Sequence, residues 1–289
     1  FTLSNCVACS LGSPVANTVT INSNEAVNGA NPVKDPNFSS DFFVRQQYLD
    51  FFNRAPDAGG LAFWKNQIDE CQTQGCREIR RINVSAAFFL SGEFQETGYL
   101  VYKTWGAAFG TTRVGSTVPL TLIEFLPDQR RVGEGVIIGQ PGADALLEAN
   151  KVAYFNEFVA RPAFIAAYPN VMTAEQFVDA LNANAGGALS AAERNQLVSE
   201  LSSATKTRAQ VLRAVVQDSD FHTAQFNRAF VLMQYFGYLR RNPNDSPNSD
   251  FSGYNFWLGK LNQFNGNFVH AEMVKSFLVS GEYRQRFGP

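Results

Sequence analysis

Residues 43–68 and 84–94 decide the fold, because the chain repeats both stretches near its end. They read FVRQQYLDFFNRAPDAGGLAFWKNQI and VSAAFFLSGEF. Their counterparts are FVLMQYFGYLRRNPNDSPNSDFSGYNFWLGKL at residues 230–261 and MVKSFLVSGEY at residues 273–283. An internal repeat of this kind predicts that one supersecondary unit is built more than once and that the units pack together.

The two copies share residues that end, begin or fill helices. In the first copy these are Phe43, Tyr48, Arg54, Pro56, Gly60, Phe63 and Trp64, and they reappear as Phe230, Tyr235, Arg241, Pro243, Gly253, Phe256 and Trp257. The sequence Ser-Gly-Glu at residues 91–93 also recurs at residues 280–282.

Apolar residues at helical spacing predict four helices in the first copy, over residues 42–53, 61–69, 77–89 and 99–109. We expect Ser40 or Asp41 to cap the first helix and Asp57 the second, because their side chains accept hydrogen bonds from free N–H groups. Residues 118–125 are expected to be extended, and residues 133–147 a glycine-rich turn followed by helix. Residues 151–168 are predicted as a helix kinked or broken at Pro162, with Ile165 facing inward.

The composition is that of a globular chain with an aromatic core. Of the 289 residues 45% are hydrophobic and 26 are Phe, which is enough to bury a sizeable core. The formal net charge of −2 and the lack of a long Lys/Arg run argue against nucleic acid as a partner. No apolar run approaches the ~20 residues that a spanning helix needs, so we expect no membrane span.

Residues 1–25 show strand alternation at Val15, Val19 and Ile21, and a Gly-Ser-Pro turn precedes them. This pattern predicts a β-hairpin, which is too small to be stable alone. Residues 26–41 are polar with two prolines and are expected to be a linker. Because the chain starts at Phe1 without a signal peptide, we expect a processed or partial chain.

The repeated pattern Phe-Val-x-x-x-Tyr, Arg-x-Pro-Asp-x-x-Gly-Leu-x-Phe-Trp and Ser-Gly-Glu-Phe resembles a bacterial domain-of-unknown-function family, numbered 4214, and remotely the phycobilisome linker domains. A degenerate middle copy keeps Phe177, Asn182, Ser190 and Asp220-Phe221. On this basis a helical domain spans residues 42–289, with units at about 42–105, 176–222 and 229–289. The resemblance implies a helical repeat of secreted, surface-layer or adhesin-like proteins, and it implies no activity.

Residues 1–25 resemble the closing strands of a Calx-β repeat, through the pattern LSN, LGSP and TVTI. This resemblance implies that the chain begins inside a truncated β-sandwich. Together with the helical repeats, it implies the carboxyl-terminal region of a large exported protein.

The four cysteines form two close pairs, Cys6 with Cys9 and Cys71 with Cys76. Two local disulfides in an exported protein are favoured, above all between Cys71 and Cys76. A Cys₄ zinc site would require the two pairs to meet in space. Four free thiols would instead indicate a cytosolic protein.

The most site-like positions are Arg54 with Asp57, and Arg241 with Asn244. An exposed Arg beside a helix N-terminus is suited to bind an anion or a partner's carboxylate. The favoured interpretation is an Arg tied to a neighbouring carbonyl or carboxylate, beside a helix cap. Glu93 and Glu282 are conceivable acid/base carboxylates, but their place in the repeat favours a structural role.

Three further features have a functional and a structural interpretation. Asp245, Asn248 and Asp250 carry oxygens of the kind that calcium binds, but a hydrogen-bonded Asx-rich loop is favoured over a metal site. The glycine-rich residues 133–139 lack the Lys-Ser/Thr of a phosphate loop and are interpreted as a turn. Trp64 and Trp257, beside Phe at helical spacing, are assigned to the core and not to sugar stacking.

The sequence thus predicts a mostly α fold, in which repeated short helical units pack into one compact body that carries an N-terminal β-hairpin. We expect an extracellular structural or interaction module at the bacterial cell surface, without catalysis or cofactor, whose partners are other surface proteins or copies of itself. One alternative is a carbohydrate-binding or hydrolytic module that uses a groove between repeats. The other is a filament or matrix subunit that assembles through the N-terminal strands.

Overall fold

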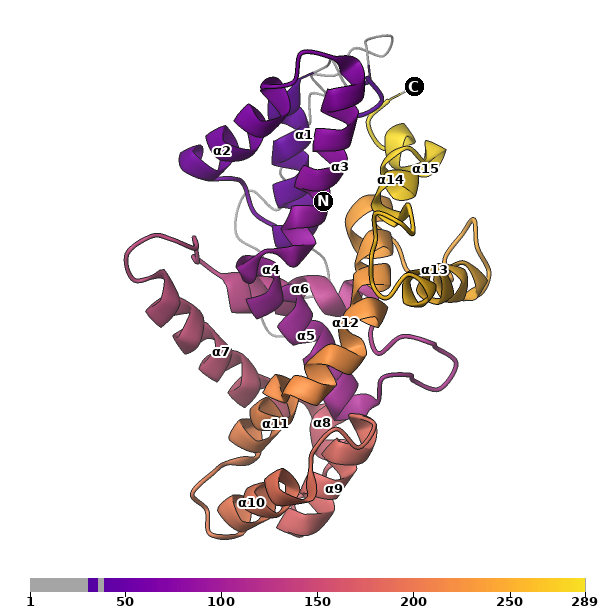
Figure 1. The fold of residues 1–289 in the computed structure, drawn as a ribbon. Coiled ribbons are helices and arrows are strands. Elements are labelled where there is room, and N and C mark those ends of the chain that lie inside the picture. The colour runs from indigo at the N-terminus through magenta and orange to yellow at the C-terminus, as the bar shows by residue number, and fades with distance from the viewer. Residues whose placement is uncertain (1–30, 36–38, 289) are drawn as a thin grey trace, which may run out of the picture.

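The computed structural model describes residues 31–35 and 39–288, and within these ranges the chain is built from helices (Figure 1). The β-type pairing among the described residues is one isolated bridge between Arg113 and Ser116. The prediction of a mostly α fold is therefore confirmed. The predicted hairpin at residues 1–25, with Cys6 and Cys9, lies outside the described residues.

The first unit begins with α1 (Ser40–Gln47), which continues into the π-helical turn η1 (Tyr48–Phe52). It is followed by α2 (Ala58–Asp69), α3 (Gln74–Leu90) and α4 (Gly92–Glu96). Asp57 caps α2 as predicted, since the N–H of Gly60 donates to its side chain. The N-cap of α1 is Ser39, one residue before the predicted position, because its side chain accepts from the N–H of Phe42.

The third unit has the same order of elements. It contains α12 (Ser219–Gln234) with η2 (Tyr235–Leu239), then α13 (Ser252–Gln263), α14 (Met273–Leu278) and α15 (Gly281–Gln285). The middle segment forms α9 (Ala174–Asn184), α10 (Ala191–Ser202) and α11 (Arg208–Gln217), and leads directly into α12. A capping side chain recurs at the start of the helix that follows α3, α11 and α14. The residues are Ser91, Asp218 and Ser280.

One backbone feature recurs with the units. Asn53 and Arg240 adopt left-handed conformations with φ of 56° and 54° at the ends of η1 and η2. Gly187, at the matching place after α9, has φ of 77°. A non-glycine residue with positive φ is strained, so the surrounding contacts must hold these two turns.

The connecting segments form α5 (Gly98–Phe109), α6 (Leu122–Gly133), α7 (Ala143–Val159) and α8 (Pro162–Ala167). Pro162 starts α8, so the predicted break is confirmed. The extended prediction for residues 118–125 is wrong from Leu122 onward, because Thr121 and Glu124 form a capping box. Pro127 lies within α6, where it lacks the N–H that would donate to the carbonyl of Ile123. Ile165 is also exposed, contrary to prediction.

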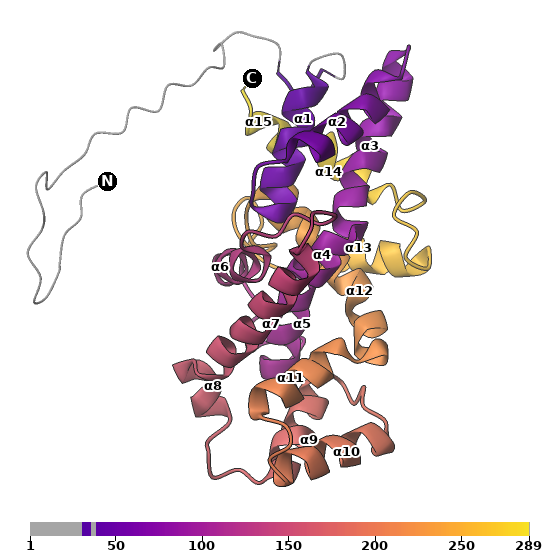
Figure 2. The same ribbon diagram turned by 90° about the vertical axis from the view of Figure 1, so that its left-hand side faces the viewer.

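The molecule is elongated, with α1–α3, α14 and α15 at one end and α9 and α10 at the other (Figures 1 and 2). The buried helix α5 packs against α4, α6, α9, α11 and α12 and so joins the ends. One continuous aromatic core runs through the body, as the Phe content predicted. No helix among the described residues is long and apolar enough to cross a bilayer.

Candidate functional site

An arginine–glutamate clamp follows η1 in the first unit. Arg54 donates from Nε and Nη2 to the two carboxylate oxygens of Glu93, both at 2.7 Å, and from Nη1 to the carbonyl of Ala55 at 3.0 Å. Its guanidinium lies 5.0 Å from the ring centroid of Tyr48. The two charged side chains are 20% and 13% exposed, so most of the pair is shielded from water. A planar guanidinium matches a carboxylate in this bidentate way, which a Lys side chain does not.

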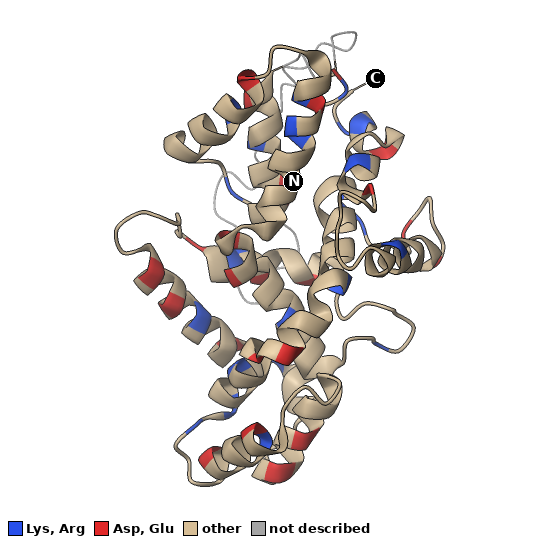
Figure 3. Cartoon of the chain, viewed as in Figure 1, with Lys and Arg blue, Asp and Glu red and all other residues tan. Residues whose placement is uncertain are grey.

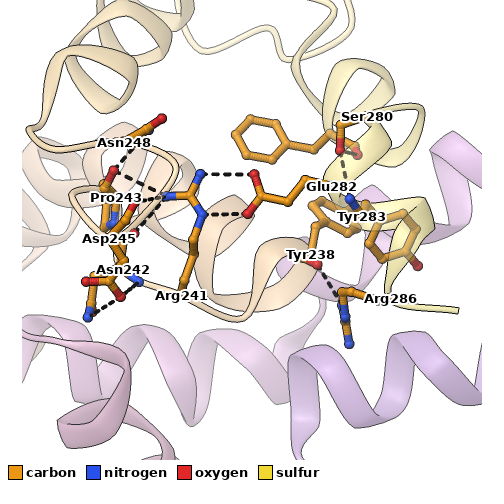
Figure 4. A network of polar contacts seen from close by, with 11 residues as sticks. Tyr238, Arg241, Asn242, Pro243, Asp245, Asn248, Ser280, Glu282, Tyr283 and Arg286 are labelled. Carbon is orange, nitrogen blue, oxygen red and sulfur yellow. Dashed lines mark hydrogen bonds and ion pairs between the residues drawn. The ribbon is translucent and has the colours of Figure 1, made fainter.

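The third unit repeats the clamp with equivalent residues (Figure 4). Arg241 donates from Nε and Nη2 to Glu282 at 2.5 and 3.0 Å, and its guanidinium lies 5.4 Å from the centroid of Tyr235. Ser280 accepts from the N–H of Tyr283 and so fixes the turn that presents Glu282. The repeated Arg and Ser-Gly-Glu motifs are therefore the two halves of one contact.

The repeated glycine belongs to the same arrangement. A Cβ atom on Gly60 would overlap Oη of Tyr48, and one on Gly253 would lie 2.8 Å from Oη of Tyr235. The tyrosine thus approaches the first turn of the second helix closely in both units. Only glycine leaves room for it.

The arginine of the first clamp keeps its charge at neutral pH. Burial opposes the charge of Arg54, but the hydrogen bonds and charge of Glu93 outweigh this effect and raise the pKa of Arg54. Burial also raises the pKa of Tyr48 and takes that of Tyr235 to about 12. Arg54, Tyr48 and Tyr235 therefore do not titrate near pH 7.

The other predicted site residues lie in the loop between η2 and α13, and most of their side chains form hydrogen bonds there. The carboxylate of Asp245 accepts from the N–H and Nδ2 of Asn242, and that of Asp250 accepts from the N–H of Ser252. Asn248 donates to the carbonyl of Pro243 at 3.1 Å, and Asn244 is exposed. Within the described ranges no group of three or more His, Cys, Asp or Glu side chains is placed to hold a metal ion.

A second carboxylate cluster was not predicted from the sequence. The buried Asp128 of α6 accepts two hydrogen bonds from Arg161, at 2.6 and 2.8 Å, and one from Nε1 of Trp105 at 2.9 Å. Arg161 also lies 4.5 Å from the ring centroid of Phe158. Asp128 and Trp105 lie on separate helices, and Arg161 lies at the N-cap of α8. They belong to no repeated motif, so sequence spacing gave no signal for the cluster.

The exposed residues that repeat are aromatic. Phe63 and Phe256 are 57% and 61% exposed, and each packs edge-on against the neighbouring Trp. Trp64 and Trp257 are partly buried and contact Phe88 and Phe277, respectively. The two tryptophans therefore belong to the core only in part. Acidic and basic residues are interspersed along the helices and do not gather in one patch (Figure 3).

The fold and the repeated clamp define an all-helical repeat protein over the described residues. A model of the family described as "Domain of unknown function (DUF4214)" matches residues 21–97, which include the first unit. The first unit is thus similar to that family, as the repeated motif had indicated. No curated protein and no solved structure matches the chain.

Proposed function

We propose that this chain is a non-catalytic interaction module of a larger exported protein and acts at the outer surface of a bacterial cell. The repeated polar residues support this proposal, because Arg54, Glu93 and their counterparts bind each other. Asp57 is likewise used as a helix cap. The residues that a catalytic interpretation would need are thus engaged in holding the fold.

The observation that carries the proposal is the pair of exposed phenylalanines. Phe63 on α2 and Phe256 on α13 present the same side chain from the same place in two units. Large aromatic side chains at the surface supply much of the binding energy in protein interfaces. A chain that displays the same aromatic twice is suited to bind a repetitive partner with two contacts.

The Cys71–Cys76 disulfide supports the exported location. It bridges the end of α2 to the first turn of α3, as predicted. Disulfides of this kind persist in oxidising compartments and are rare in the cytosol.

The test compares the chain with a Phe63→Ser, Phe256→Ser double variant for binding to cell envelopes isolated from the source bacterium. We expect saturable binding by the parent chain and about tenfold weaker binding by the double variant, with an unchanged melting temperature. Ile123→Ser is the matched control, because Ile123 is 81% exposed but lies on α6, outside the repeated motif. Equal binding by the double variant, or release of soluble sugar from the envelopes, contradicts the proposal.

A further inference from the structure

A hollow lies beside the first clamp. It has a volume of about 420 Å³ and lies between the end of η1 and the end of α6. Its wall combines apolar side chains with the cations Arg54 and Arg130, the carboxylate of Glu134 and a glycine-rich backbone. The lining residues are Phe52, Asn53, Arg54, Ala55, Arg130 and residues 133–137.

The two clamp arginines, Arg54 and Arg241, differ in the number of acceptors that their Nη1 atoms contact. In the third unit, Nη1 of Arg241 donates to the carbonyls of Asn242, Pro243 and Asp245 at 3.0–3.4 Å (Figure 4). In the first unit, Nη1 of Arg54 has one partner among the described residues, the carbonyl of Ala55. Because Nη1 carries two hydrogens, Arg54 keeps donor capacity that Arg241 has used.

The cause of this difference is visible in the sequence. The third unit carries the extra residues 245–250 between its Pro243 and α13, whereas Pro56 is followed at once by Asp57 and α2. Part of this insertion supplies an acceptor to Arg241, since the carbonyl of Asp245 belongs to it. In the third unit, Nη1 of the clamp arginine thus donates to carbonyl oxygens, one of which comes from the insertion. The first unit lacks this inserted segment and its acceptor.

Arg130 is the cation of the wall that has no ion-pair partner among the described residues, and the wall also holds one carboxylate, that of Glu134. The charge of Arg54 is balanced by Glu93, and neighbouring Arg131 pairs with Glu157 at 2.7 Å and with Glu134 at 3.7 Å. Arg130 is exposed and makes no hydrogen bond or ion pair with the described part of the chain. Its guanidinium therefore remains available to an anion that enters the hollow.

The remaining wall is apolar. Phe52 lies on one side, and Val136 and Ile137 follow α6 on the other. A small inorganic anion would leave these side chains without a partner. A ligand that joins a carboxylate to a short apolar body would use both parts of the wall.

We propose that this hollow binds a carboxylate on an apolar body, such as the terminal residue of a peptide that ends in leucine. The carboxylate lies between Arg130 and Nη1 of Arg54, and the apolar part contacts Phe52 and Ile137. This site is separate from the exposed Phe63 and Phe256, so it stands whether or not those residues contact a partner.

The experiment titrates the 289-residue chain with N-acetyl-leucine and with N-acetyl-leucinamide, and follows saturation transfer by NMR. The two probes share the apolar body and differ in the carboxylate. We expect the acid to bind with a dissociation constant of about 1 mM and the amide at least about tenfold more weakly. Inorganic phosphate is the third probe and should bind more weakly than the acid.

Arg130→Gln is the main variant, because Arg130 is exposed and its loss breaks no contact with the described residues. It should weaken binding of the acid by about tenfold, whereas Arg130→Lys should retain most of it. Arg80→Gln, which removes an exposed arginine of α3 far from the hollow's lining, is the control and should change nothing.

Three results would overturn the proposal. The first is equal binding of acid and amide, or no saturable binding of either at about 20 mM. The second is unchanged binding in a folded Arg130→Gln variant. The third is phosphate binding as tight as that of the acid, which would show that the apolar wall contributes nothing.

Discussion

Phe51 and Tyr238 occupy the same position in the first and third units, and their ring centroids lie 5.3 Å apart with the planes at 78°. A residue that contacts its own counterpart lies near an axis of approximate twofold symmetry. η1 and η2 therefore meet face to face at the centre of the contact between the two units. Polar contacts surround this centre: Arg286 donates to the buried Asp50 at 2.8 and 3.1 Å, and Gln47 donates to Tyr283.

The first prediction concerns Gly237, which lies against the ring of Phe51. A Cβ atom there would come within 2.9 Å of that ring, so Gly237→Ala must displace a buried side chain at the centre of the contact. We expect it to lower the free energy of unfolding by about 1–3 kcal/mol. Gly259→Ala on α13 is the control, since a Cβ there meets nothing within 4 Å.

Chemical denaturation measures both variants. Gly259→Ala should be neutral or stabilising by up to about 1 kcal/mol, because alanine favours helix more than glycine does. If Gly237→Ala is tolerated as well as Gly259→Ala, the packing of η1 on η2 is looser than described.

The second prediction concerns the clamp. Arg54→Gln should reduce stability by about 1.5–3 kcal/mol, because Glu93 would stay shielded from water without its partner. Arg45→Gln breaks an exposed pair with Asp41 and should cost no more than about 0.5 kcal/mol. A double-mutant cycle with Glu93→Gln separates the pair from its surroundings. A coupling energy near zero would show that the clamp contributes little to folding.

The sequence predicted the helices of the first unit well, because proline, capping residues and apolar periodicity act locally. It also favoured a carboxylate or carbonyl partner for Arg54, and the repeat contained that partner in Glu93. The pairing itself was not predicted, since 39 residues separate Arg54 from Glu93. Residues 122–125 were predicted to be extended, although Thr121 and Glu124 form a local capping box that favours helix.

The hollow beside Arg54 depends on the packing of α6 against η1, which no local pattern encodes. No local pattern encodes the pairing of Asp128 with Arg161 either, because the two residues are 33 positions apart. Tertiary contacts between unrelated segments thus account for the two sites that sequence reasoning missed, whereas the repeated motifs account for the clamp residues that it singled out.

The third prediction separates two neighbouring aromatics. Trp257 contacts the ring of Phe277 and belongs in part to the core, so Trp257→Ala should cost about 2–4 kcal/mol. Phe256 is 61% exposed, and Phe256→Ala should cost less than about 1 kcal/mol. Thermal or chemical unfolding decides between them. If Phe256→Ala lost more stability than Trp257→Ala, the tryptophan and not the phenylalanine would be the residue available to a partner.

The fourth prediction concerns Cys71 and Cys76. Intact-mass measurement should show the unreduced protein lighter than the reduced protein by the two hydrogens of this disulfide, in addition to any contributed by Cys6 and Cys9. Alkylation of Cys71 and Cys76 before reduction would contradict the disulfide and weaken the case for export. Because the closed loop is short, Cys71→Ser with Cys76→Ser should cost only about 2 kcal/mol.

The last prediction concerns Lys103, a lysine of α5 that is only 5% exposed. Its Nζ lies 3.4 Å from Nδ1 of His222, and the charged groups near it are Glu96, Lys151 and Asp218. Burial is the largest effect and lowers the pKa of Lys103 to about 8. Glu96 and Asp218 oppose this effect and raise the pKa, whereas Lys151, which is itself paired with Glu96, lowers it.

The sign of the pH dependence follows from this lowered pKa. An unfolded chain holds the Lys103 proton up to a pH of about 10.4, whereas the folded chain releases it above about 8. Between these values the unfolded state binds more protons, so this lysine makes stability rise with pH. At pH 7 the folded state carries a buried charge, and Lys103→Met should raise stability by about 1–3 kcal/mol.

Unfolding free energies of the parent chain and Lys103→Met, measured from pH 7 to 10, test the prediction. The difference between them should shrink as pH rises, and the contributions of other groups, such as Arg81, largely cancel in that difference. Lys275→Met, at an exposed lysine, should show a flat difference over the same range. The pKa of His222, which burial and the charge of Lys103 lower, should rise in Lys103→Met. A Lys103→Met chain that is less stable at pH 7 would show instead that the amine makes a net favourable contact with His222.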